Sequence, residues 1–128
     1  MIKTAWAHLP NAKHIAAVLA DARKRPGAWD AARCAARTAA RDAAWDAARR
    51  AAWDAAWGAA RDAARDAAWG AARTAARDAI AALVTWDSSA DLLECTPDVL
   101  RAMIDLAEPP VCHQAVLLLP YAIVRMHA

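Results

Sequence analysis

Between Trp29 and Ile80 the chain repeats one pattern of four residues, here called a tetrad. Its first position is Trp or Arg, and its second is mostly Asp, otherwise Thr, Gly, Cys or Arg. The third and fourth positions are both Ala, except that Ile80 ends the last tetrad. Because Ala is the strongest helix former, Arg is a good one and no Pro interrupts the repeat, the pattern predicts helix throughout.

The four-residue period also predicts how these helices pack. Four residues turn a helix by about 40° more than one full turn, so the Ala-Ala ridge spirals slowly and in the right-handed sense. Ridges of this kind interdigitate at steep crossings near −50°. We therefore expect the Ala-Ala positions to form the closest helix contacts, and Leu in place of Ala63 or Ala64 to force helices apart.

The simplest architecture for the repeat is one long helix over residues 28–84, roughly 85 Å in length. Gly58 and Gly70 are the two positions where it could be kinked or broken, because Gly is unfavourable inside a helix and common just after one. If the helix is continuous, the shorter flanking segments cannot cover it, and a symmetric dimer would be needed.

Shorter helices are predicted in residues 1–27. Asn11 is a candidate N-cap, and Pro26-Gly27 marks the end of the segment. Between them an apolar stripe follows helical spacing: Ile15, Val18, Leu19 and Ala22.

Residues 85–128 predict a C-terminal helical cap with most of the large aliphatic side chains. The serines of Trp86-Asp87-Ser88-Ser89 suit the cap of a short helix, and Thr96-Pro97-Asp98 is a strong helix start. We expect one buried helix face (Val99, Leu100, Met103, Ile104 and Ala107) and deep burial of the run 116–119. The fold class is all-α, in a single domain over 1–128.

Composition favours an intracellular setting. Three cysteines, Cys34, Cys95 and Cys112, show no paired spacing, which suits free thiols in a reducing compartment. The N-terminus lacks the apolar core of a secretory signal, and the longest apolar run contains Pro120 and is too short to span a membrane. We expect a cytoplasmic protein without a membrane segment.

The formal net charge is only +2, but charge is distributed unevenly. Residues 1–27 are basic and residues 85–128 are acidic, so the two ends could attract each other within or between chains. Arg23, Lys24 and Arg25 lie in a last helical turn, where cations complement the helix dipole. A nucleic-acid patch is the alternative interpretation of these three residues.

Chemistry for catalysis or for a cofactor is not indicated. No Gly-rich phosphate loop occurs, and the four histidines show no metal-binding spacing. Cys95, Cys112 and His113 form a weak candidate for metal ligands, so we expect no metal, no cofactor and no enzyme activity.

Tryptophan is the unusual feature of the repeat. It takes the place of Arg, so both side chains must lie over the helix surface in similar geometry. These residues are either packing anchors or an interaction surface for another protein, where Trp and Arg are enriched. The candidates are Trp29, Trp45, Trp53, Trp57 and Trp69.

The run AAWDAARRAAWDAAWGAARDAARDAAWG, with the later TWDSSADLL and AVLLLPYAIV, resembles alanine-rich tetrad-repeat proteins of bacteriophages and high-GC bacteria. A looser likeness is to alanine-rich immunity proteins of toxin systems. The resemblance implies protein binding and carries over no site residues. We therefore expect a non-catalytic interaction protein with a protein partner or a second copy, a dimer being the first choice. A nucleic-acid-binding accessory protein is the alternative.

Overall fold

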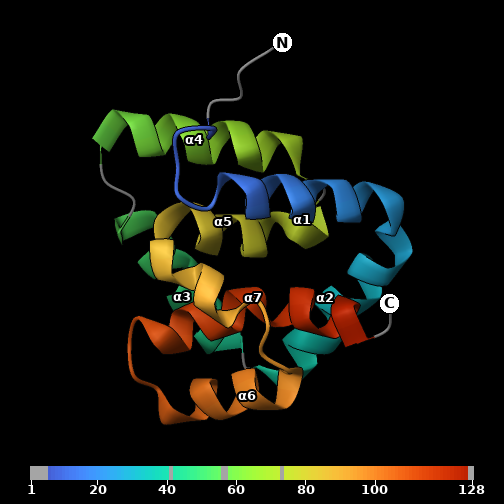
Figure 1. Cartoon of the computed structure of the whole chain (residues 1–128). Helices are drawn as coiled ribbons and strands as arrows, with labels where there is room; N and C mark the ends of the chain where they lie inside the picture. Colours follow the sequence, from blue (N-terminus) through green and yellow to red (C-terminus); the bar gives the residue numbers. More distant parts are fainter. Residues whose placement is uncertain (1–5, 41, 56–57, 73, 127–128) are drawn as a thin grey trace.

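The computed structural model describes residues 6–40, 42–55, 58–72 and 74–126, and these residues form helices joined by short connections (Figure 1). The all-α prediction is confirmed, and no strand occurs in the described ranges. The α-helices are α1 (Ala12–Lys24), α2 (Pro26–Ala39), α3 (Asp42–Ala55), α4 (Gly58–Ala71), α5 (Arg77–Thr85), α6 (Pro97–Leu106) and α7 (Val111–Met126). Two 3₁₀ segments are η1 (Thr74–Ala76) and η2 (Asp87–Leu92).

The repeat is not one long helix, which corrects the expectation for residues 28–84. Ala40 has extended backbone angles (φ −112°, ψ 135°), so the helix ends there, although no glycine is near. Helix α3 ends at Ala55 and α4 begins at Gly58, so the repeat is broken at one of the two predicted positions, whereas Gly70 lies inside α4. The starts at residues 26, 42, 58 and 74 are sixteen residues apart, which is four tetrads.

This spacing explains how a spiralling repeat can bury one face. Within fourteen residues the fourth tetrad position drifts only about 120° around the helix, and each new start resets the drift. Among the fourth-position alanines whose burial is described, Ala44 alone is partly exposed, and the others are buried: Ala32, Ala36, Ala40, Ala48, Ala52, Ala64, Ala68, Ala72 and Ala76. The third-position alanines of α2 and the first half of α3 are exposed: Ala31, Ala35, Ala39, Ala43 and Ala47. The prediction that both alanines make close contacts is wrong for this outer row.

Helix α7 is the centre of the molecule, in contact with α2, α3, α5 and α6 (Figure 1). Its residues 116–119 are buried as predicted, and the helix continues through Pro120. On the other side α5 supports α1 and α4. Because helices of all three sequence segments contribute to one apolar cluster, the segments share a single core.

The N-terminal segment is anchored by Asn11 in an unexpected way. Asn11 precedes α1 but makes no cap hydrogen bond to that helix. Its buried Nδ2 donates instead to the carbonyl oxygens of Leu83 (3.0 Å), Trp86 (3.2 Å) and Asp87 (3.2 Å). The side chain thus ties the start of α1 to carbonyls at and just beyond the C-terminal end of α5. The apolar stripe of α1 is buried as predicted.

The C-terminal hairpin begins where its sequence signals predicted. The Thr96 Oγ1 accepts a hydrogen bond from the Val99 amide, as an N-cap does. Arg125, near the end of α7, donates to the Leu93 carbonyl and to Glu94 Oε2, the latter at 2.9 Å. Together these contacts fix the start of α6 against the end of α7.

Candidate interaction surface

Trp29 and Trp45 are core residues, with 0% and 1% of their surface exposed. Neither can touch a partner in this fold, which corrects their assignment to an interaction surface. They stand sixteen residues apart, at the same place in successive helices, where both meet the interior. Both residues therefore act as packing anchors and not as an interaction surface. Trp57 lies outside the described residues.

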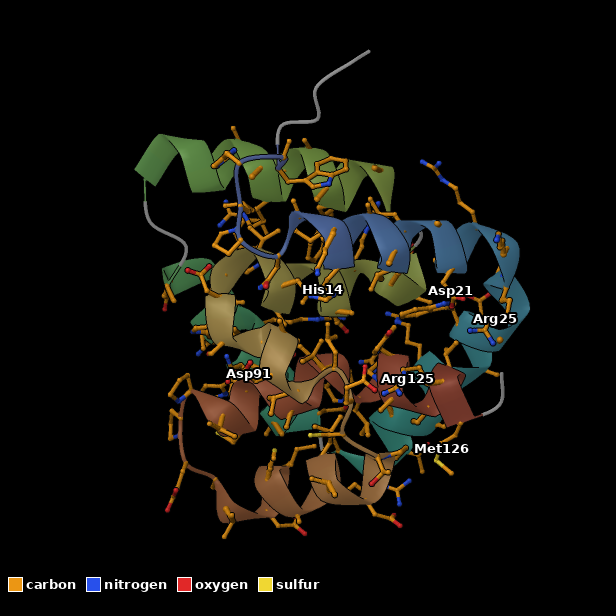
Figure 2. All side chains as sticks on the ribbon, viewed as in Figure 1. His14, Asp21, Arg25, Asp91, Arg125 and Met126 are labelled. Atoms are coloured by element: carbon orange, nitrogen blue, oxygen red, sulfur yellow. The ribbon has the colours of Figure 1, made fainter. Side chains whose placement is uncertain are left out.

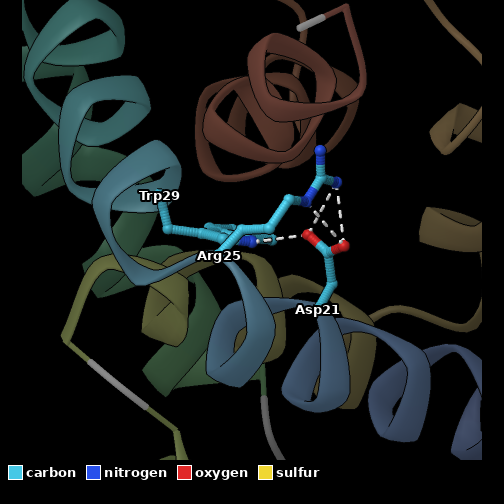
Figure 3. A network of polar contacts seen from close by, with 3 residues as sticks. All are labelled: Asp21, Arg25 and Trp29. Carbon is cyan, nitrogen blue, oxygen red and sulfur yellow. Dashed lines mark hydrogen bonds and ion pairs between the residues drawn. The ribbon is translucent and has the colours of Figure 1, made fainter. Parts of the chain in front are cut away.

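The Trp29 indole is held by a carboxylate that also binds an arginine (Figure 3). Trp29 Nε1 donates to Asp21 Oδ2 at 2.8 Å. Arg25 Nη2 donates to both oxygens of Asp21, at 2.8 and 3.0 Å, so one acid joins α1 to α2. Arg25 is therefore engaged within the fold, and the basic cluster predicted on α1 keeps Arg23 and Lys24 as exposed cations.

Trp45 occupies the equivalent place in α3 without the equivalent acid. Its Nε1 is buried and has no hydrogen-bond partner among the described residues. The Arg49 guanidinium lies 6.0 Å from the ring centre and binds Asp78 at 3.0 Å, which ties α3 to α5. The ring is thus retained by packing, and its polar edge is unsatisfied.

Trp53 and Trp69 form a clasp between α3 and α4. Their ring centres are 5.8 Å apart, and the Arg65 guanidinium stacks 3.6 Å from the Trp53 ring. Trp53 is 45% exposed, whereas Trp69 is partly covered by Arg77, 5.5 Å from its ring. Because these rings already contact each other and two cations, we interpret them as a structural clasp that joins α3 to α4.

The larger uncovered apolar surface lies around α6. Contrary to expectation, only Leu100 of the predicted buried face is fully covered, because α6 packs chiefly on α7. Relative to Leu100, Ile104 is rotated by about 40° and Val99 by about 100° to the other side, so one neighbour cannot cover both. Leu106 is 68% exposed. Of the five large apolar side chains exposed in the described ranges, four belong to α6 and α7: Val99, Leu106, Val111 and Met126.

Four hollows lie between α2 or α3 and the hairpin of α6 and α7, in two pairs that each share lining residues, and we call them together the α6 groove. The first, about 270 Å³, lies between α2 and the end of α7. The second, about 300 Å³, shares Ala35 and Ile123 with the first and includes Pro97 at the start of α6. Figure 2 shows Met126, which also lines it, at the end of α7.

The other half of the α6 groove lies beside α3. The third hollow, about 300 Å³, is lined by Ala39, Ala40, Ala43, Ala44, Ile104 and Asp105. The fourth, about 220 Å³, shares Ala44 and Ile104 with it and reaches Val116 of α7. The outer alanine row therefore forms one wall of the α6 groove, and Ile104 belongs to the other.

Charge is unequal on the two walls. On the α6 wall, Arg101 binds Asp98 at 3.1 Å, whereas Asp105 and Glu108 are exposed without an ion-pair partner among the described residues. On the α3 wall, Asp46 and Arg50 are both exposed and oppose each other in sign. The α6 wall thus carries the excess negative charge.

The residues considered as metal ligands from the sequence stay apart in the described part of the chain. No three His, Cys, Asp or Glu side chains come together there as metal ligands. Ser88 and Ser89 lie inside η2, whose start has no side-chain cap hydrogen bond, and both hydroxyls accept from Gln114 Nε2, at 2.9 and 3.2 Å. Cys34, Cys95 and Cys112 are free thiols.

Comparison of the chain with protein-family models, curated proteins and solved structures found no match. Within the described ranges, no helix combines the length and the apolar character that crossing a membrane requires.

Proposed function

We propose that this chain is a non-catalytic helical protein that works in the cytoplasm by binding another protein through the α6 groove. One observation carries the proposal: α6 has apolar side chains around much of its circumference but a single main neighbour. Two pairs of hollows lie on the flank of the α6–α7 hairpin toward α2 and α3, and Pro97 and Ile104 are the apolar residues that α6 contributes to them. Uncovered apolar surface of this kind marks interaction sites on folded proteins. The free thiols support a reducing compartment.

A heterologous partner is favoured over a second copy. The dimer expected from the sequence depended on a long uncovered helix, and the repeat instead folds back on itself. Two copies that joined groove to groove would also bring two acidic α6 walls together. An immunity-type role, as the resemblance implies, would be one form of such heterologous binding.

Affinity purification of tagged variants from the native cell tests the proposal. Ala43→Leu/Ala47→Leu fills the groove from two exposed positions, and Ala63→Leu/Ala71→Leu places the same residues at exposed third positions of α4. With tagged full-length baits, we expect a protein that the unchanged chain and the α4 variant retain equally and the groove variant loses at least about tenfold. Identical retained proteins for all three baits would contradict the proposal.

The alternative function, nucleic-acid binding through α1, retains Arg23 and Lys24 as its exposed cations. Retention on DNA or RNA columns at increasing salt tests it, because phosphate contacts weaken steeply with salt. We expect no retention at physiological salt. Retention that Arg23→Ala/Lys24→Ala abolishes would favour this alternative.

A further inference from the structure

The shape of the α6 groove selects a helix as its occupant. The outer alanines recur every four residues on α2 (Ala31, Ala35, Ala39) and again on α3 (Ala43, Ala47). Rows of small side chains at this spacing accept the i, i+4 ridge of another helix at close range. Strand addition by an extended peptide would need an exposed strand edge, and the described residues contain no strand.

The charges at the groove favour positively charged side chains on that helix. Asp105 lines the third hollow directly, and Glu108 adjoins Ala107, which lines the fourth. Both carboxylates are exposed and lack an ion-pair partner in the described ranges, and the only cation of α6 already binds Asp98. Cations on a docked helix would meet these acids at the rim, where charge determines orientation and association rate.

We infer that the α6 groove binds an amphipathic α-helix of a partner protein, with its apolar ridge in the hollows and Lys or Arg along the flank that faces α6. This inference rests on the proposed function and specifies the partner segment. Leu or Met side chains at i, i+3, i+4 and i+7 supply the ridge, as in other helix-in-groove complexes.

Two synthetic helices of about five turns provide the test, measured by fluorescence anisotropy with the full chain. Both carry the same Leu ridge, one with Lys and one with Glu along one flank. We expect the Lys peptide to bind about tenfold more tightly at low salt, with the difference shrinking to about twofold at about 0.5 M salt. Equal binding of both peptides, or binding of neither, would overturn the inference.

Variants of the protein locate the binding. Asp105→Asn/Glu108→Gln should weaken the Lys peptide about fivefold or more and flatten its salt dependence. Asp66→Asn/Asp91→Asn removes two exposed carboxylates elsewhere and should leave binding unchanged. Ala43→Leu/Ala47→Leu should abolish binding of the Lys peptide, and undiminished binding by this variant would place the site elsewhere.

The remaining outcomes separate the inference from the proposed function. A groove-dependent cellular partner whose contacting segment is not a basic helix would overturn the inference and leave the proposed function standing. The remaining possibility is that the groove binds a second copy of the chain. Light scattering of the unchanged chain and of Ala43→Leu/Ala47→Leu measures this. A dimer that this variant dissociates would assign the groove to a second copy and overturn both.

Discussion

The inner and outer faces of α2 and α3 are built from the same residue in the same repeat but have different environments. The inner face carries the fourth-position alanines with Trp29 and Trp45 and is buried, whereas the outer face carries the third-position alanines and lines the α6 groove. Their helix propensity and hydrophobicity are identical. The difference therefore arises from tertiary contact with α7, and the role of an alanine follows from the face on which it lies.

The largest effect should separate the buried from the exposed tryptophans. Trp45→Ala removes a fully buried ring, so we expect a loss of roughly 3–5 kcal/mol in the free energy of unfolding. Trp53→Ala removes a half-exposed ring of the clasp and should lose about 1 kcal/mol. Chemical denaturation measures both, and equal losses would remove the distinction between core and surface rings.

Enlarging adjacent alanines on one helix should change the stability of the fold by different amounts. Ala48→Leu inserts a large side chain into the inner face and should destabilise by roughly 1–3 kcal/mol, whereas Ala47→Leu projects into the groove and should change stability by less than about 0.5 kcal/mol. On α4 the same contrast is expected between buried Ala64 and exposed Ala63, which corrects the expectation that both positions are tight. Similar losses within each pair would mean that both rows are packed.

A smaller effect should distinguish the two buried indoles. Trp29→Phe removes a donor to the Asp21 carboxylate, whereas Trp45→Phe removes a buried N–H without a partner among the described residues. Because hydrogen bonds to charged groups stabilise and orphaned donors destabilise, Trp29→Phe should lose about 1 kcal/mol more stability than Trp45→Phe. The comparison uses melts of both variants under one buffer condition. A larger loss for Trp45→Phe would reveal a bound water or another acceptor at Nε1.

Local signals predicted much of the fold. The helical repeat, the stripe of α1, the cap at Thr96 and the buried run of α7 were all readable, because propensity and spacing agree there. The steep −50° crossings stay a prediction.

The break at Gly58 was one of the two predicted from the sequence, but the break at Ala40 was not. Asp42 begins a helix while Asp46 and Asp54 lie within one, and Gly58 begins the helix in which Gly70 lies. Since identical residue types occupy both kinds of place, local preference cannot choose between them. Packing against α5 and α7 selects the breaks, and that information is not local in sequence.

The candidate site was predicted least well. The tryptophans of the repeat were predicted as candidates for an interaction surface, yet two are buried in the core and two form the clasp. The α6 groove depends on which flank of α6 remains uncovered after α7 has bound Leu100, so only the tertiary structure reveals it. One signal was present: six apolar side chains in ten residues exceed what one neighbouring helix can cover.

Solvent access to isotope-labelled alanine methyl groups tests the central claim most directly. In NMR spectra with a neutral paramagnetic gadolinium complex, we predict strong broadening for the methyl groups of the outer row and none for the inner row of α2 and α3. The Lys peptide should then protect the outer row of α2 and α3 but not Ala63 or Ala71 of α4. Equal broadening of both rows, or protection of Ala63 and Ala71 together with the groove, would contradict the division into a core face and a binding face.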